Sequence, residues 1–338
     1  MITHRLNRRV MACEFEVIAC DEDGDRAAAA AHDALDEAAR LEFCLSRFVE
    51  TSDIARVNAR GAAEPVRVSP ETVEVLEAAR RLCAVTDHAF DVTAAPLTRL
   101  WREARANGRP PGRRRIAEAL AHVGMHHVHT DADDNTVWLD QPGTEIDLGA
   151  IGKGFAVDRA AEALLRYGIA DFAVCGAEST LRVLGTAPDL TPRQSGWLFR
   201  PRNPLDPSRE VAAFCLSRGA VATSSQTEQQ FRHRGKVFGH VLDPRTGWPV
   251  PAECATILIA PNATEADALA TAFLVLGPER SSDLAKLHCG VSVAFIECGT
   301  TPDEARLTWS VRSEDLPAEP SPVGAMCRET IRIQHTET

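Results

Sequence analysis

The chain has 338 residues, of which 44% are hydrophobic and 25% are charged, and this composition is typical of a soluble globular protein with a large core. Its 37 basic and 48 acidic side chains give a formal net charge of -11, which argues against nucleic acid or an anionic membrane as the main partner. No run approaches the roughly 18 apolar residues of a membrane span, and the basic N-terminus lacks the apolar segment of a signal peptide. We therefore expect a cytoplasmic protein with no membrane insertion, no signal peptide and no lipoprotein signal.

Hydrophobic periodicity predicts helices and strands in alternation along the chain. The expected helices lie at residues 25–47, 72–85, 96–104, 156–165, 266–275 and 281–286. The expected strands lie at residues 10–19, 123–129, 135–140, 173–184, 211–216, 237–242, 255–259 and 291–296. Residues 106–115, rich in Arg, Gly and Pro, are expected to form an exposed loop. Together these elements predict an α+β fold with mixed, largely antiparallel sheets and packed helices.

Residues 87–101 form the first segment whose composition points beyond local structure. A turn, a short strand and a helix that starts at Pro96 explain its local pattern. Phe90 beside Asp91 could equally hold a planar heterocycle by stacking and hydrogen bonding.

Cysteine and histidine are weak evidence for a metal centre here. The ten cysteines are scattered and include no C-x-x-C pair, so reduced thiols are the simplest interpretation. The histidines at 126, 127 and 129 enter a predicted strand whose faces alternate, which disfavours a shared metal.

Residues 145–158 contain the most informative pattern in the chain. A short apolar strand with Asp147 near its end is followed by three glycines and Lys153, and then by an amphipathic helix. Glycine permits close backbone approach and a helix N-terminus favours negative charge, so the segment predicts a phosphate-bearing ligand. The spacing matches neither the P-loop nor the Rossmann motif, and a plain strand-to-helix turn is the alternative.

Residues 240–249 place His240 at the start of a predicted strand that runs into a turn. Asp-Pro followed by Thr-Gly is ordinary turn chemistry and needs no function. A histidine near a phosphate can also act as a base or as a positive contact, so both interpretations stay open.

Residues 262–273 predict a helix on which Asp267 and Thr271 are four positions apart and share one face. Their oxygens could bind one hard cation. The alternative is a capping-box variant formed by Thr264 and Asp267, and the two roles are compatible.

The order of these segments resembles that of a known family, the FAD:protein FMN transferases or ApbE-type flavin transferases, over residues 11–296. The matching motifs are Ser46-Arg47-Phe48 with Ser52 to Asn58, Ala89 to Thr93 with Pro96-Leu97 and Leu100-Trp101, Asp147 to Gly154, His240 to Gly247, and Ala266 to Thr271. Ordered matches of this kind are far more specific than any one motif. The resemblance implies an ApbE-like, T-fold-related architecture.

The resemblance also implies a reaction. Members of the family bind FAD with a divalent cation, usually Mg²⁺; a Ser or Thr hydroxyl of a target flavoprotein takes the FMN, and AMP leaves. By motif position the Ala150 carbonyl, Asp267 and Thr271 would hold the metal, an oxygen set suited to Mg²⁺. His240 and Asp267 would serve catalysis, with His240 either assisting proton transfer from the incoming hydroxyl or stabilising the transition state. The residues implied to hold the flavin nucleotide are Met11, Ala89, Phe90, Asp91, Asp147, Lys153 and Val241.

Several positions depart from the family pattern. The family's Met-Gly-Thr, Gly-Gly-Asp/Asn and Thr-Ser-Gly-x-Tyr-x-Arg motifs, and the Ser before its motif His, correspond here to Met11-Ala12-Cys13, Gly176-Ala177-Glu178, Thr223 to Gln229, and Gly239. A side chain in place of glycine costs about 1–2 kcal/mol where φ is positive, so the loops near Ala177 and Ser225 are expected to differ in path.

Two other activities are compatible with these departures. One is an FAD pyrophosphatase that gives FMN and AMP, and the other is a non-catalytic FAD-binding or carrier protein. We expect one flavin transferase domain over residues 1–300 and a partly irregular extension over residues 301–338. An alternative is that residues 1–300 form two subdomains with FAD bound at their junction.

Overall fold

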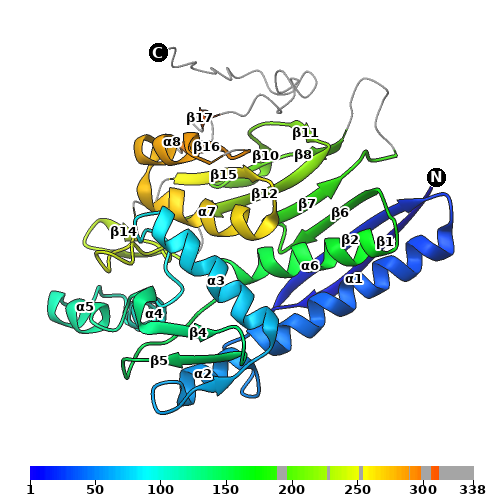
Figure 1. Ribbon diagram of the computed structural model, residues 1–338. Coiled ribbons are helices and arrows are strands. Elements are labelled where there is room, and N and C mark those ends of the chain that lie inside the picture. Colours follow the sequence, from blue (N-terminus) through cyan, green and yellow to red (C-terminus); the bar gives the residue numbers. More distant parts are fainter. Residues whose placement is uncertain (189–195, 227–228, 251–253, 289, 298–305, 312–338) are drawn as a thin grey trace.

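The computed structural model describes residues 1–188, 196–226, 229–250, 254–288, 290–297 and 306–311, and its largest element is an eight-stranded sheet (Figure 1). Every pair of neighbouring strands in this sheet is antiparallel. The order across the sheet is β1 (Ile2–Val10), β2 (Cys13–Asp21), β6 (Asp171–Gly176), β7 (Thr180–Leu184), β12 (Arg218–Ser225), β15 (Cys254–Ala260), β16 (Ser292–Glu297) and β17 (Arg306–Val311).

Helices cover one face of this sheet (Figure 1). The covering helices are α1 (Gly24–Leu45), α6 (Gly152–Arg166), α7 (Ala263–Leu276) and α8 (Pro278–Lys286). Helix α3 (Pro70–Val85) packs on the outer side of this layer, against α1 and α7. The buried faces of α1, α6 and α7 are rich in alanine. Small side chains let helix backbones approach closely, and the main hydrophobic core lies between these helices and the sheet.

A smaller layer lies beyond α3 (Figure 1). It contains a three-stranded antiparallel sheet in the order β3 (Val66–Arg67), β5 (Thr136–Leu139) and β4 (Val128–Asp131). Its helices are α2 (Asp53–Arg60), α4 (Ala95–Ala106) and α5 (Arg113–Leu120), with a 3-10 turn η1 at Met125–His127. Short two-stranded pairs complete the described part: β8 (Trp197–Phe199) with β11 (Phe214–Leu216), β9 (Arg202–Asn203) with β10 (Asp206–Glu210), and β13 (Phe231–His233) with β14 (Lys236–Phe238).

The predicted α+β class with largely antiparallel sheets is confirmed. The expected strand at 10–19 is present but starts later, at Cys13, because a left-handed turn at Met11 and Ala12 separates β1 from β2. The expected single strand at 173–184 is wrong, since Ala177 and Glu178 turn the chain between β6 and β7. The expected loop at 106–115 ends earlier, because Gly112 caps α5.

Residues 306–311, within the expected extension, form β17 and pair with β16 in the main sheet. The rest of that extension, residues 312–338, lies outside the described residues, and the division at residue 300 stays a prediction.

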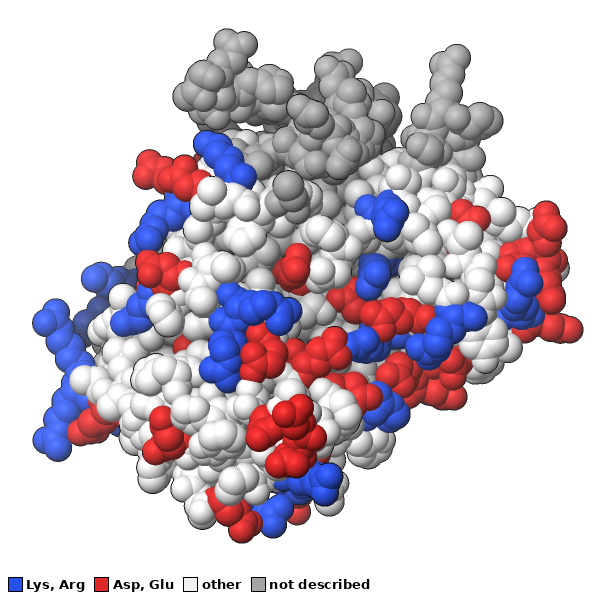
Figure 2. All heavy atoms as spheres, viewed as in Figure 1, with Lys and Arg blue, Asp and Glu red and all other residues white. Residues whose placement is uncertain are grey.

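None of the helices in the described ranges is long and apolar enough to cross a membrane. Figure 2 shows acidic and basic side chains intermingled over one face of the molecule.

The cysteines at 13, 20, 44, 83, 175 and 215 are free thiols in the structure. Burial raises the pKa of the Cys175 thiol to about 11 and also raises that of Cys83. Both groups are therefore protonated and poorly nucleophilic at neutral pH.

Candidate functional site

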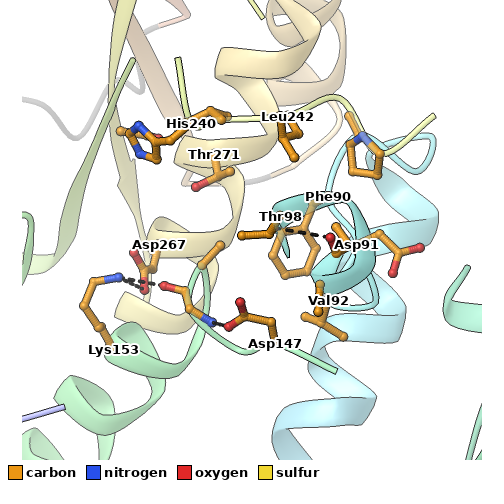
Figure 3. Close-up of a pocket in the computed structure, with 18 of the residues that line it drawn as sticks. Phe90, Asp91, Val92, Thr98, Asp147, Lys153, His240, Leu242, Asp267 and Thr271 are labelled. Carbon is orange, nitrogen blue, oxygen red and sulfur yellow. Dashed lines mark hydrogen bonds and ion pairs between the residues drawn. The ribbon is translucent and has the colours of Figure 1, made fainter. Parts of the chain in front are cut away.

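Segments far apart in the sequence line one cavity of about 500 Å³ (Figure 3). They are the loop after α3, the start of α4, the glycine segment at the start of α6, the β6–β7 turn, the end of β12, the segment after β14, and one face of α7. All but one of the predicted site residues line it: Ala89, Phe90, Asp91, Asp147, Ala150, Lys153, His240, Val241, Asp267 and Thr271. Met11 lies instead in the β1–β2 turn and packs against the main core, so its contact with a flavin stays a prediction.

The glycine segment is held in place by backbone hydrogen bonds to distant residues. The expected strand before it is wrong, since only Glu145 forms an isolated bridge, with Ala94. The Asn58 side chain accepts from the Ile146 N–H at 2.7 Å and donates to the Ile146 carbonyl at 2.9 Å. The next N–H, of Asp147, donates to the Val92 carbonyl at 2.7 Å. Side-chain and loop contacts therefore replace a strand ladder in fixing Asp147 at the cavity.

Helix α6 starts inside the glycine segment, at Gly152, earlier than expected. Two of the three glycines thus lie in its first turn, where Lys153 also lies. The Lys153 ammonium donates to the Gly149 carbonyl at 2.9 Å and lies 3.5 Å from an Asp267 carboxylate oxygen. A plain strand-to-helix turn does not require a lysine and a helix N-terminus to lie together at one cavity wall, as they do here. The arrangement therefore favours the binding of an anionic ligand over the plain-turn alternative.

Gly154 sets the distance between α6 and α7. A Cβ atom at this position would lie 2.2 Å from the Ala263 carbonyl oxygen and 2.8 Å from the Asp267 Cβ. The Gly154 N–H donates to the Asp267 carboxylate at 3.0 Å. The absence of a side chain therefore permits both the close helix contact and the placement of Asp267 beside Lys153.

The Asp267 carboxylate is buried, with 6% of the residue exposed. Besides Gly154 and Lys153, the Thr180 hydroxyl donates to it at 3.2 Å. Unlike charges at ~4 Å and an effective dielectric of ~20 attract by about 4 kcal/mol, which stabilises the contact between Asp267 and Lys153. One wall of the cavity thus carries a fixed anion and a fixed cation side by side.

The capping interpretation of Asp267 is wrong. The N-cap of α7 is Asn262, whose side chain accepts from the Glu265 N–H at 2.8 Å. The Thr264 hydroxyl instead donates to the buried Asp158 at 2.6 Å, which also accepts the Ala263 and Thr264 N–H groups. Asp267 is therefore free of any capping role and, with Thr271, faces the cavity (Figure 3).

The segment that carries His240 is not a strand as expected. Strand β14 ends at Phe238, and His240 lies exposed in a bend that borders the cavity. The following turn rests on α4, where the Trp101 indole N–H donates to the Gly247 carbonyl at 2.8 Å. Turn contacts, rather than sheet pairing, hold the histidine at the cavity.

Gln226, to which no sequence motif assigns a role, clamps this segment. Its fully buried side chain accepts from the Val241 N–H at 2.7 Å and donates to the Val241 carbonyl at 2.8 Å and the Val250 carbonyl at 3.1 Å. A Cβ at Gly239 would lie 2.3 Å from the Gln226 side-chain carbon Cδ. Gln226 and Gly239 are therefore matched, because the amide occupies the space that a side chain at 239 would need.

We expect Gln226→Ala to lower the free energy of unfolding by about 1–3 kcal/mol for each buried group left unpaired. We also expect it to lower kcat, because His240 directly precedes the clamped Val241. Gly239→Ser should also destabilise the protein, by overpacking against the amide. Urea unfolding of the two single variants and the double variant measures the coupling. The double variant should lose less than the sum of the two, and strict additivity would contradict the matched pair.

Asp91 is engaged by the protein itself. Its carboxylate accepts from the Thr93 N–H at 2.8 Å, the Thr93 hydroxyl at 2.5 Å and the Met125 N–H at 3.0 Å. The Cys83 thiol also donates to it at 3.6 Å. The geometry therefore favours a role for Asp91 in shaping the 89–93 loop, and its direct contact with a flavin stays a prediction.

Cys83, His88 and Asp91 lie close enough together to be considered as ligands of one metal ion. Among the described residues, they form the one cluster of three or more such side chains. The raised pKa of Cys83 and the occupied Asp91 carboxylate favour a hydrogen-bonded cluster instead. His127 and His129 likewise each bond to Asp140, at 2.8 Å and 2.9 Å.

Ala177 borders the cavity in a left-handed conformation, with φ of 58°. Ala177 therefore carries the backbone strain expected where a side chain replaces glycine at positive φ. Ser225 does not, because it lies in β12 and its φ is not positive.

We expect Ala177→Gly to raise the free energy of unfolding by up to about 1 kcal/mol, since about 1–2 kcal/mol of strain exceeds the entropy cost of glycine. Urea unfolding tests this. Ala62→Gly, at an exposed turn residue without positive φ, should lower the stability, and equal effects of the two changes would contradict the assignment of strain.

Three comparisons with known proteins bear on this cavity. The family model described as ApbE family matches residues 11–295. A curated FAD:protein FMN transferase of Treponema pallidum is 31% identical over 80% of this chain and 79% of its own length. One of Vibrio cholerae is 32% identical over 72% of each chain.

Solved structures of ApbE proteins have a fold similar to that of this chain. The crystal structure of the ApbE protein of Thermotoga maritima has a TM-score of 0.78 and 28% identity, covering 93% of this chain and 97% of that one. The flavin transferase ApbE of Vibrio cholerae has a TM-score of 0.75 and 25% identity, covering 91% and 97%. The similarity thus includes every segment that lines the cavity.

Proposed function

The chain belongs to the ApbE family and is an enzyme of the transferase class, and from this membership and its cavity we propose that it transfers FMN from FAD to a Ser or Thr hydroxyl of a target flavoprotein, with release of AMP. The observation that carries the proposal is the convergence of Lys153, Asp267 and Thr271 on one cavity wall at the N-terminus of α6. This wall supplies the positive charge and oxygen ligands that a pyrophosphate with a cation needs. A cytoplasmic location remains part of the proposal.

The donor atoms fit the implied magnesium ion. The Asp267 carboxylate, the Thr271 hydroxyl and the Ala150 carbonyl line the same cavity, and all are oxygen donors. Protein sites for Mg²⁺ in phosphoryl-transfer enzymes commonly supply one or two carboxylates and take further ligands from the substrate phosphates and water. When bound, the ion would neutralise phosphate charge. Lys153 would add a second positive charge from the protein itself.

The proposed reaction requires the protein side chains to take part in only one proton transfer. The acceptor hydroxyl oxygen forms a bond to the phosphorus of the FMN half, the bond from that phosphorus to the bridging oxygen breaks, and AMP leaves with the bridging oxygen. We propose that His240, exposed at the edge of the cavity, takes the hydroxyl proton. Phosphoryl transfer depends mainly on positioning and charge neutralisation, so a site of this composition is sufficient.

The decisive experiment is incubation of the protein with FAD, Mg²⁺ and a candidate acceptor flavoprotein, followed by the intact mass of the acceptor and an assay for AMP. A mass gain equal to FMN together with AMP release supports transfer. Release of AMP without a mass gain supports the pyrophosphatase, in which water attacks instead of the hydroxyl. Bound FAD with neither product supports the non-catalytic carrier.

A further inference from the structure

A second cavity, of about 260 Å³, lies beside the first and shares Thr98 and His240 with it. Three arginines line it, together with aromatic side chains. These residues are Arg47, Arg102, Arg105, Phe48, Trp101 and Phe231. We refer to this second cavity as the arginine groove.

The arginine groove carries positive charge in a protein whose net charge is -11. Arg47 is ion-paired with Asp147 at 3.2 Å, so this charge comes from Arg102 and Arg105. No Asp or Glu is among the described residues that line it. Arg102 is exposed and makes no hydrogen bond or ion pair with any described residue. Arg105 donates through one nitrogen to the Gln229 carbonyl at 3.1 Å and to its side-chain oxygen at 2.7 Å, which leaves its other donors available.

An arginine fork recognises a carboxylate or a phosphate. In the proposed reaction the acceptor hydroxyl must touch both His240 and the FMN phosphorus, while FAD occupies the first cavity. His240 is common to both cavities, so a chain that delivers the hydroxyl from the side opposite FAD passes through the arginine groove. Phe48, 76% exposed, adds an apolar contact at this groove.

We propose that the arginine groove receives the acceptor segment that carries the reacting hydroxyl, and that this segment bears a carboxylate close to the hydroxyl. This inference rests on the proposed transfer of FMN. It assigns Arg102 and Arg105 to recognition of the acceptor, apart from the residues that hold FAD.

The test compares Arg102→Glu with Arg81→Glu. Both arginines are exposed on helices without a partner among the described residues, and Arg81 lines neither cavity. The probes are two fluorescein-labelled heptapeptides with a central Thr, one with Asp and one with Lys on each side, and the FAD-loaded protein is titrated into them at low salt. The Asp peptide should bind more tightly, and Arg102→Glu should weaken it about tenfold or more while Arg81→Glu leaves it unchanged. Equal binding of the two peptides, or equal effects of the two substitutions, would overturn the proposal.

FAD binding separates this inference from the proposed function. Quenching of flavin fluorescence should be the same in Arg102→Glu and the original protein. If Arg102→Glu weakens FAD binding as much as peptide binding, the groove belongs to FAD and the acceptor assignment is wrong. If the original protein binds the Asp peptide but never transfers FMN to an acceptor, the proposed function fails and the groove remains a carboxylate-binding site without its assigned role.

Discussion

Asp267→Asn is expected to lower the rate of FMN transfer by at least about 10–100-fold, the loss typical of removing even an outer partner of a bound metal. The substitution keeps the size of the side chain but removes the charge that faces Lys153 at 3.5 Å in the cavity wall. The amide can still accept from the Gly154 N–H and donate to Thr180, so the fold should survive. The measurement is the initial rate of AMP release and acceptor mass gain at increasing Mg²⁺ concentration.

The Mg²⁺ dependence identifies the cause of the loss. If Asp267 holds the ion, the Asn variant should need more Mg²⁺ for half-maximal rate, and Thr271→Val should show a smaller shift in the same direction while Thr271→Ser does not. Asp134→Asn, at an exposed turn remote in sequence from the cavity segments, serves as the matched control. Full activity of Asp267→Asn with unchanged Mg²⁺ dependence would remove Asp267 from the metal site.

The sequence could predict the face shared by Asp267 and Thr271, because helical spacing depends on local geometry alone. It could not exclude the capping role of Asp267, since that depends on which residue starts the helix. Asn262 caps α7, and Asp158 from α6 binds Thr264, a contact between residues more than a hundred positions apart. Local sequence patterns cannot predict contacts between residues so far apart in the chain.

The same limit explains the errors in the strands. The expected strand at 173–184 is a hairpin and the one at 10–19 begins with a turn, because Ala177 and Ala12 adopt left-handed conformations that sequence patterns associate with glycine or asparagine. The apolar neighbours of His240 suggest a strand, but beyond Phe238 their side chains pack in different directions. Leu242 packs against α4, and Val241 packs against Val250 and Leu274. Gln226 carried no signal at all, since its role appears only when Gly239 is beside it in space.

Gly154→Ala is the second change for which we expect a large effect. The added methyl group would meet the Ala263 carbonyl oxygen at 2.2 Å, and a backbone atom cannot move aside as the end of a side chain can. Overpacking in a core costs about 1–3 kcal/mol and sometimes more, and here α6 and α7 must separate to relieve it. We expect the free energy of unfolding to fall by about 3 kcal/mol or more, a large part of the roughly 5–15 kcal/mol that stabilises a typical protein.

Gly152→Ala is the matched control, two residues earlier in the same helix. Its Cβ would make only an ordinary contact, 3.5 Å from the Leu148 Cβ, so stability should be unchanged or raised by up to about 1 kcal/mol. Separation of the helices in Gly154→Ala would also move Lys153 away from Asp267, and FAD affinity should therefore fall even at temperatures where the variant is folded. If both alanine variants unfold at the same urea concentration and bind FAD equally, the close contact of α6 and α7 does not set the geometry of the site.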